Sequence, residues 1–198
     1  RDSSTSRGLG DVYKRQPSTS PDLLAFAREA GRQAVRLAQM EHMRPSDIVT
    51  MDSFENAILV HAAISGSTNC LLHIPAIAHE LGIEITGDTF DRIHRNARYL
   101  LDVRPAGRWP AECFYYAGGV PAIMEEIKDY LHLDVMTVTG KTLGENLKEL
   151  KENGFYEKCD KWLQEFNKRY GVNVTKEDII RPYDNCLLYT SPSPRDVE

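Results

Sequence analysis

The sequence predicts an α/β fold, in which a helix-rich chain with few short strands forms part of a larger α/β domain. Three observations lead to this prediction. Apolar residues recur at helical spacing over most of the chain. Only two short runs, residues 83–85 and 135–138, have the composition of strands. Turns that contain glycine or proline separate these segments, and there is no internal repeat.

The first helix is expected from Pro21 to about His42. Ser20 offers a hydroxyl cap, Pro21 takes the first helical position, and Asp22 places an acid in the first turn. Charged residues fall mostly on the other face of this helix, so it is amphipathic. Its helical spacing is carried by Leu23, Phe26, Ala27, Ala30, Ala34, Leu37 and Ala38.

The later helices are identified by their start and stop signals. They are expected after Thr50, after Asn69 to about Leu81, from Asp88 to about Asn96, after Pro121 to about Leu131, after Thr142 to about Glu152, and from Phe155 to Tyr170. Thr50 caps the first of these helices, and Gly82 is a left-handed stop for the second. The buried side of the helix after Thr50 is expected to carry Phe54, Ala57, Ile58 and Ala62.

The segments between these helices are expected to be strands, turns or loops. Ile83–Ile85 and Val135–Val138 are the two predicted strands. Residues 44–47 are predicted to form a turn and residues 104–107 a loop, because both contain proline.

Composition and charge exclude several classes of protein. The chain has 198 residues, 41% of them apolar, which suits one domain or a piece of a larger one. Its formal net charge of −5 argues against a broad phosphate-binding surface, so no nucleic-acid partner is expected. No apolar run approaches the roughly 18 residues needed to span a bilayer, so no membrane partner is expected. Four widely spaced cysteines without a CxxC pair fit a reducing, cytoplasmic location.

The two tails differ from the rest of the chain. Residues 1–16 and 186–198 are rich in Ser, Arg, Pro and Gly and show no periodicity. One permitted coding of residues 6–16 has a reverse complement that translates, one base in, to the run from residue 186 to residue 195. Both tails are therefore interpreted as translated sequencing adapter and are expected to be disordered. The natural part of the chain is expected over residues 17–185.

Two motifs are more often structural than functional. Thr139–Thr142 reads TGKT, but a phosphate-binding loop needs a glycine at position 135, which is Val135. The histidines form no HExxH pair, and each is expected to be a hydrogen-bonded or surface imidazole: His42, His61, His73, His79, His94 and His132.

The turn at Ser65–Asn69 is the candidate substrate-binding site. It is made of small, hydroxyl-rich residues that open a helix: Ser65, Gly66, Ser67, Thr68 and Asn69. Such a turn is expected to present free backbone amides and hydroxyls, which suit a carboxylate or phosphate. An ordinary helix cap with glycine easing the turn is the alternative.

Four stretches lie in an order and spacing typical of one enzyme family: Ser53–Ile83, Phe114–Ile127, Leu133–Leu147 and Ile179–Asn185. The first reads SFENAILVHAAISGSTNCLLHIPAIAHELGI, the second FYYAGGVPAIMEEI and the third LDVMTVTGKTLGENL. Together they resemble the N-terminal domain of the family that contains dihydroxy-acid, 6-phosphogluconate and sugar-acid dehydratases. The resemblance covers nearly all of residues 17–185, although Ser65 stands where many members have a second glycine.

This resemblance implies a hydro-lyase that removes water from a 2,3-dihydroxy acid and yields a 2-keto-3-deoxy acid. It also implies an iron–sulfur cluster and magnesium in a full-length, homo-oligomeric parent. The cluster cysteines and the lysine and acids at the magnesium are expected before Pro17, and the catalytic base and a further metal carboxylate are expected after Asn185. No catalytic or metal-binding residue is therefore assigned here, and the chain alone is expected to bind no cofactor and to be inactive.

The substrate expected from the resemblance is a sugar acid such as a pentonate. Phe114–Tyr116 and Arg104–Pro110 resemble the sugar-acid enzymes more closely than the branched-chain amino-acid enzyme. Three alternatives remain open: a dihydroxy-acid dehydratase of branched-chain amino-acid synthesis, a non-enzymatic module that binds an anion at residues 65–69, and a structural piece with no ligand.

Overall fold

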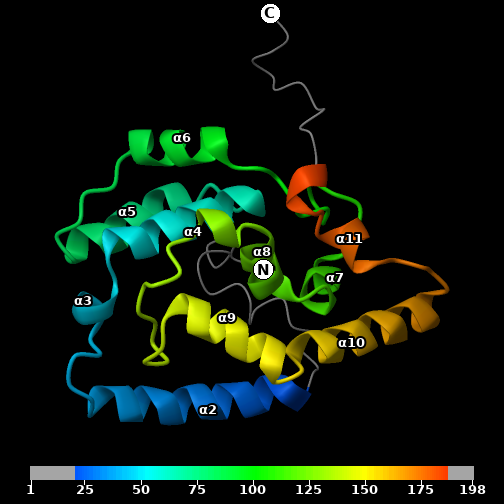
Figure 1. Ribbon diagram of the computed structural model, residues 1–198, viewed down its shortest axis with the longest axis horizontal. Helices are drawn as coiled ribbons and strands as arrows, with labels where there is room; N and C mark the ends of the chain where they lie inside the picture. The colour runs from blue at the N-terminus through cyan, green and yellow to red at the C-terminus, as the bar shows by residue number, and fades with distance from the viewer. Residues whose placement is uncertain (1–20, 187–198) are drawn as a thin grey trace, which may run out of the picture.

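The computed structural model describes residues 21–186. The two tails expected to be disordered, residues 1–16 and 186–198, therefore lie outside the described part except for Cys186. Helices dominate that part, as predicted (Figure 1). They are α2 (Pro21–Ala38), α3 (Pro45–Ile48), α4 (Met51–Ala63), α5 (Cys70–Glu80), α6 (Gly87–Asn96), α7 (Ala111–Tyr116), α8 (Gly119–Glu126), η2 (Lys128–Tyr130), α9 (Leu143–Glu152), α10 (Phe155–Tyr170), α11 (Lys176–Ile179) and η3 (Tyr183–Asn185).

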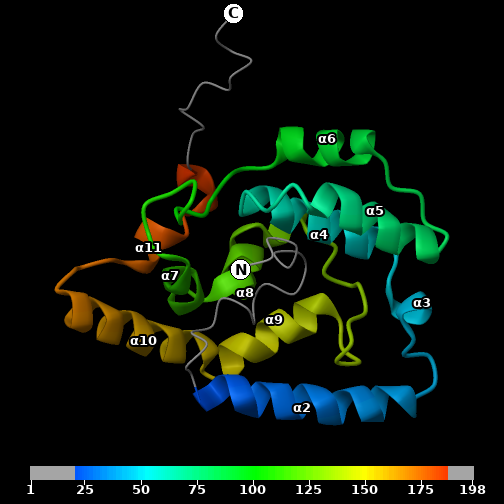
Figure 2. The ribbon, with the colours of Figure 1, turned by 180° about the vertical axis from the view of Figure 1, so that it is seen from behind.

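Helix α4 is the centre of the fold. It contacts α5, α6 and α8, and it lies between α5 and α8 in both views (Figures 1 and 2). The Thr50 hydroxyl accepts a hydrogen bond from the Ser53 amide, which confirms the predicted cap. Buried residues occupy nearly every side of the helix: Phe54, Asn56, Ile58, Val60, His61 and Ala63. The helix is therefore enclosed by the fold rather than laid on its surface.

Two hydrophobic clusters meet on α4. The smaller one packs α4 against α5 and α6, with Ile58 and Ile74 fully buried. The larger one joins the end of α4 to α7, α8, α10 and α11, with Leu100, Ile123 and Ile179 fully buried. Because α4 contributes to both clusters, it connects α5 and α6 to α7, α8, α10 and α11.

Neither predicted strand forms. Residues 83–85 run through a loop in which Ile85 is buried in the smaller cluster. Residues 135–138 belong to a loop that folds back, where the Thr137 amide donates to the Lys141 carbonyl at 3.0 Å. Over residues 21–186 the only β contacts are three isolated bridges. The α/β prediction is thus confirmed for its helices and wrong for its strands, because the described segments offer these short runs no partner strand.

Two element boundaries also differ from the predictions. Helix α2 ends at Ala38, four residues early, and His42 has a positive φ of 58° in the turn that follows. Residues 45–48 form the short helix α3 rather than a turn. The predicted helices α5, α6, α9 and α10 are confirmed, and α10 has the predicted bounds. No helix in the described range is long and apolar enough to cross a membrane.

Candidate functional site

The Ser65–Asn69 turn joins α4 to α5. Its entry is fixed by two backbone hydrogen bonds, from the Ser65 amide to the Ala62 carbonyl at 3.1 Å and from the Gly66 amide to the His61 carbonyl at 2.9 Å. Ser65 has a φ of +50°, a left-handed conformation that non-glycine residues rarely adopt. Ser65 and Thr68 are exposed, whereas Gly66, Ser67 and Asn69 are half-buried.

The imidazole of His61 packs under this turn. His61 is 9% exposed, and its Nε2 lies 2.9 Å from the Ser67 carbonyl oxygen. A carbonyl oxygen can only accept, so Nε2 carries the proton. A Cβ added to Gly66 would overlap the His61 ring, so only glycine fits at that position.

A second imidazole completes the contact. His94 of α6 stacks on His61, with ring centroids 5.2 Å apart and planes inclined by 24°. Its Nε2 lies 3.3 Å from the Nδ1 of His61. Burial, together with the neighbouring His61, lowers the pKa of His94 below its ordinary value, and Asp91 opposes this shift. Neither imidazole was expected to do more than satisfy its own hydrogen bonds.

Several amides of this turn, and the first four amides of α5, have acceptors within the chain. The amides of Cys70 and Leu71 donate to the carbonyls of Ser67 and Thr68, both at 3.0 Å. The next two amides donate to the Asn69 carbonyl, and the Asn69 amide points to the Ser67 hydroxyl at 3.3 Å. This tight turn satisfies groups that a simple helix N-terminus would leave open. The start of α5 therefore does not present a row of open amides to a ligand.

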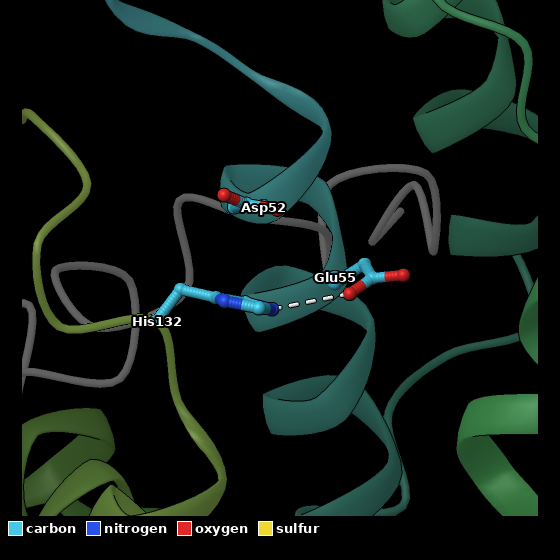
Figure 3. A group of neighbouring side chains, drawn as sticks. All are labelled: Asp52, Glu55 and His132. Atoms are coloured by element: carbon cyan, nitrogen blue, oxygen red, sulfur yellow. Dashed lines mark hydrogen bonds and ion pairs between the residues drawn. The ribbon is translucent and has the colours of Figure 1, made fainter.

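A second polar cluster lies at the start of α4, where the sequence analysis expected none. Asp52 and Glu55 stand three residues apart on one helix face, and the His132 ring extends toward Glu55 from the loop after η2 (Figure 3). One potential ligand atom from each residue lies within 4.8 Å of the other two. The buried side chain of Asn56 holds His132 in place, because its amide bonds both the carbonyl and the amide of His132 at 2.9 and 2.8 Å.

This cluster is better explained by ion pairs than by a metal centre. Glu55 pairs with Arg92 of α6 at 2.6 Å and with His132 at 3.1 Å. The Arg92 hydrogen bond lowers the pKa of Glu55, partial burial opposes that shift, and His132 adds to the lowering. A cation bound here would be repelled by the Arg92 guanidinium and by the positive end of the α4 dipole. The sequence gives no sign of this cluster, because Glu55 and His132 are 77 residues apart.

The cysteines of the described part do not fit an iron–sulfur cluster. Such a cluster needs several thiolates around one centre. Cys70, Cys113 and Cys159 are buried and Cys186 is half-buried. None of these four forms a disulfide, and none belongs to a group of potential metal ligands among the described residues. Burial raises the pKa of Cys113 to about 12 and that of Cys159 to about 11, so both remain thiols.

The residues expected to select a sugar acid have structural roles. Arg108 is bound to the buried carboxylate of Asp102, with its Nε and amide nitrogen each 2.8 Å from a carboxylate oxygen. Phe114 is 2% exposed in the larger cluster, and Tyr115 stacks on Trp162 at 5.1 Å. Core packing therefore accounts for Phe114 and Tyr115, and the ion pair with Asp102 accounts for Arg108, whereas residues 104–106 are exposed.

Comparison with known proteins gives one consistent result. The family model described as dihydroxy-acid/6-phosphogluconate dehydratase N-terminal matches residues 13–146. The chain is 44% identical over 171 residues, 85% of its own length, to a dihydroxy-acid dehydratase of Caldicellulosiruptor saccharolyticus. It is 48% identical over 126 residues, 64% of its length, to dihydroxy-acid dehydratase 1 of Methanosarcina acetivorans. These matches cover 27% and 23% of the two relatives, so the chain spans about a quarter of their length.

Proposed function

This chain belongs to the dihydroxy-acid/6-phosphogluconate dehydratase N-terminal family, and from that premise we propose that the whole protein is a hydro-lyase acting on a dihydroxy acid. The reaction removes a proton from C2 and hydroxide from C3 of a 2,3-dihydroxy acid, which together leave as water. The enol that remains tautomerises to a 2-keto acid. The observation that carries this proposal is the family match, which covers most of the chain.

We propose a branched-chain 2,3-dihydroxy acid as the substrate, in place of the sugar acid expected from the sequence. The relatives named above are called dihydroxy-acid dehydratases. The residues that favoured a sugar acid, Arg108 and Phe114–Tyr116, have structural contacts that explain them without a ligand. The contacts of these residues therefore no longer favour a sugar acid as the substrate.

We propose that the Ser65–Asn69 turn contributes to the substrate cleft of the whole protein. It lies inside the stretch that matches the family, and its exposed hydroxyls on Ser65 and Thr68 are available to a polar ligand. His61 supports the backbone of the turn through its hydrogen bond to the Ser67 carbonyl. Such support suits a site that must present its side chains in one geometry.

The cofactors implied by the family are not assigned to this chain. The described cysteines form no group of potential metal ligands. The Glu55 carboxylate already pairs with Arg92 and His132. We therefore derive no catalytic step through an iron–sulfur cluster or magnesium from the residues described.

The substrate proposal is tested by specificity constants of the full-length protein. We expect kcat/KM for 2,3-dihydroxyisovalerate to exceed that for a pentonate by at least about tenfold, because a site shaped for an alkyl end gains nothing from extra hydroxyls. A higher specificity constant for the pentonate would instead identify a sugar acid as the substrate. Absence of turnover with either acid, in protein with its cofactors loaded, would contradict the dehydratase proposal itself.

A further inference from the structure

The turn between α4 and α5 has a backbone that needs support from outside itself. Ser65 holds a left-handed φ of +50°, a conformation that is unfavourable for a residue with a side chain. The chain reverses there between two helices over only six residues. A neighbouring group must therefore stabilise this conformation against more relaxed alternatives.

His61 is the group that meets this turn most closely. Its ring packs against Gly66 so tightly that no Cβ fits between them. Its Nε2–H donates to the Ser67 carbonyl at 2.9 Å, one residue further along. One imidazole thus supports two consecutive residues, and it does so from a buried position with little freedom to move.

The protonation pattern of the pair follows from the carbonyl acceptor. The Ser67 carbonyl favours the tautomer with the proton on Nε2 of His61, and in that tautomer Nδ1 holds a lone pair. His94 lies with its Nε2 3.3 Å from that lone pair, so a hydrogen bond there requires a proton on His94 Nε2. The two rings then form a one-directional chain, from His94 to His61 to Ser67.

We propose that His61 is the positioning residue of the Ser65–Asn69 turn, and that His94 selects the tautomer in which His61 can do this. If the proton of His61 moved to Nδ1, Nε2 would become an acceptor and would face the Ser67 carbonyl with two lone pairs opposed. The donor on His94 disfavours that state because it occupies Nδ1. The link to catalysis rests on the proposed substrate role of the turn.

An ordinary buried histidine would give a different result. Such a ring only forms hydrogen bonds with neighbouring groups. Removal of one of these groups would leave both the tautomer and the nearby loop unchanged. Here His94 of α6 contacts Nδ1 of the His61 ring, and the Ser67 carbonyl contacts Nε2 of the same ring. The proposal therefore predicts that a change at His94 alters the hydrogen bond to Ser67. This coupling across two elements is what the experiment measures.

The test uses the 198-residue chain and two matched variants of His94. His94→Gln keeps an N–H donor near the position of Nε2, whereas His94→Phe keeps the stacked ring and removes the donor. Imidazole nitrogen shifts report the tautomer of His61, and amide hydrogen exchange reports the order of residues 65–69. Because His61 itself is unchanged, failure of a His61 variant to fold cannot obscure the result.

We expect His61 to be the Nε2–H tautomer in the parent chain and in His94→Gln. In His94→Phe we expect a mixture of tautomers and exchange of the Gly66 and Asn69 amides that is about tenfold faster. A predominant Nδ1–H tautomer in the parent chain would overturn the proposal. Unchanged tautomer and exchange in His94→Phe would overturn the role of His94.

The same variants in the full-length protein separate this inference from the proposed function. If His94→Phe loosens the turn and lowers kcat/KM while His94→Gln restores both, the positioning role and the substrate role both stand. If the turn loosens but kcat/KM is unchanged, the positioning role stands and the substrate role of the turn is wrong. If kcat/KM falls without any change in tautomer or exchange, the positioning role is wrong.

Discussion

At the scale of single residues, Glu55 ties α4 to two distant segments. Its carboxylate bonds Arg92 of α6 and His132 of the loop after η2. Its side chain is 25% exposed, so solvent weakens these ion pairs only in part. Because the folded-state pKa of Glu55 is lowered, Glu55 stabilises the fold above its unfolded pKa, and this contribution is lost as the pH falls through the folded pKa.

Replacing Glu55 with glutamine tests this contribution. We expect Glu55→Gln to lower the free energy of unfolding by about 0.5–1 kcal/mol at neutral pH. The difference from the parent chain should begin to shrink below the ordinary glutamate pKa of about 4.3, where the unfolded chain takes up the proton, and should vanish as the pH falls through the lowered folded pKa of Glu55. Urea denaturation at several pH values measures both effects. The exposed Glu84→Gln is the matched control, and an equal effect there would contradict the assignment.

Gly66 gives a second prediction at this scale. We expect Gly66→Ala to destabilise the chain by about 1–3 kcal/mol, because a methyl group would overlap the His61 ring. The cost should be clearly smaller when His61 is also alanine, which a double-mutant cycle measures. Gly31→Ala is the control, since nothing lies near its Cβ position. Additive costs of the two substitutions would show that the ring and the glycine do not interact.

The residue-scale contacts illustrate what the sequence can and cannot show. The caps at Thr50 and Thr142 were predictable, because donor and acceptor lie three residues apart. The pairing of His61 with His94, and of Asn56 with His132, joins residues 33 and 76 positions apart. Such contacts depend on how the helices pack against one another, and a single sequence contains no signal for this packing.

At the scale of elements, helix α2 stands apart from the others. It lies at the edge of the fold, away from α4, α5 and α6 (Figure 2). Exposed apolar side chains line it, including Leu24, Phe26 and Val35. Its periodicity predicted the helix correctly, yet the described residues give the apolar face little to pack against. An 18-residue helix without such packing is only marginally stable in water.

Amide hydrogen exchange tests this difference between elements. We expect the amides of α2 to exchange at least about a hundredfold faster than those of α4, because α4 opens only when both core clusters open. Peptide-level exchange followed by mass spectrometry resolves the two helices. Equal protection of α2 and α4 would contradict the prediction, since it would place α2 in the cooperative core.

The two wrong strand predictions have a common cause. Residues 83–85 and 135–138 are rich in β-branched residues, which favour extended backbone. Both segments are indeed non-helical, so the local preference was read correctly. A strand also needs a partner, and that depends on the rest of the fold rather than on the run itself. The helices were more predictable because their hydrogen bonds are local.

At the scale of the whole molecule, two clusters share one central helix. The smaller cluster fixes α5 and α6 against α4, and so determines where the Ser65–Asn69 turn lies relative to His94. The larger cluster buries Phe114 and packs against Tyr116, two of the residues from which a sugar acid was expected. Packing of these helices thus explains where the candidate site lies relative to His94.

We propose that the whole protein dehydrates a dihydroxy acid with the Ser65–Asn69 turn in its substrate cleft. The Asn69 side chain makes no capping hydrogen bond at α5, so its removal should not cost a helix cap. The most direct measurement is kcat/KM of the full-length protein for 2,3-dihydroxyisovalerate, in the parent and in Asn69→Ala, alongside their melting temperatures. We predict turnover by the parent and a loss of about tenfold or more in Asn69→Ala, roughly 1.4 kcal/mol of transition-state stabilisation, with little change in melting temperature. Unchanged turnover in Asn69→Ala, or a matching fall in melting temperature, would contradict the claim.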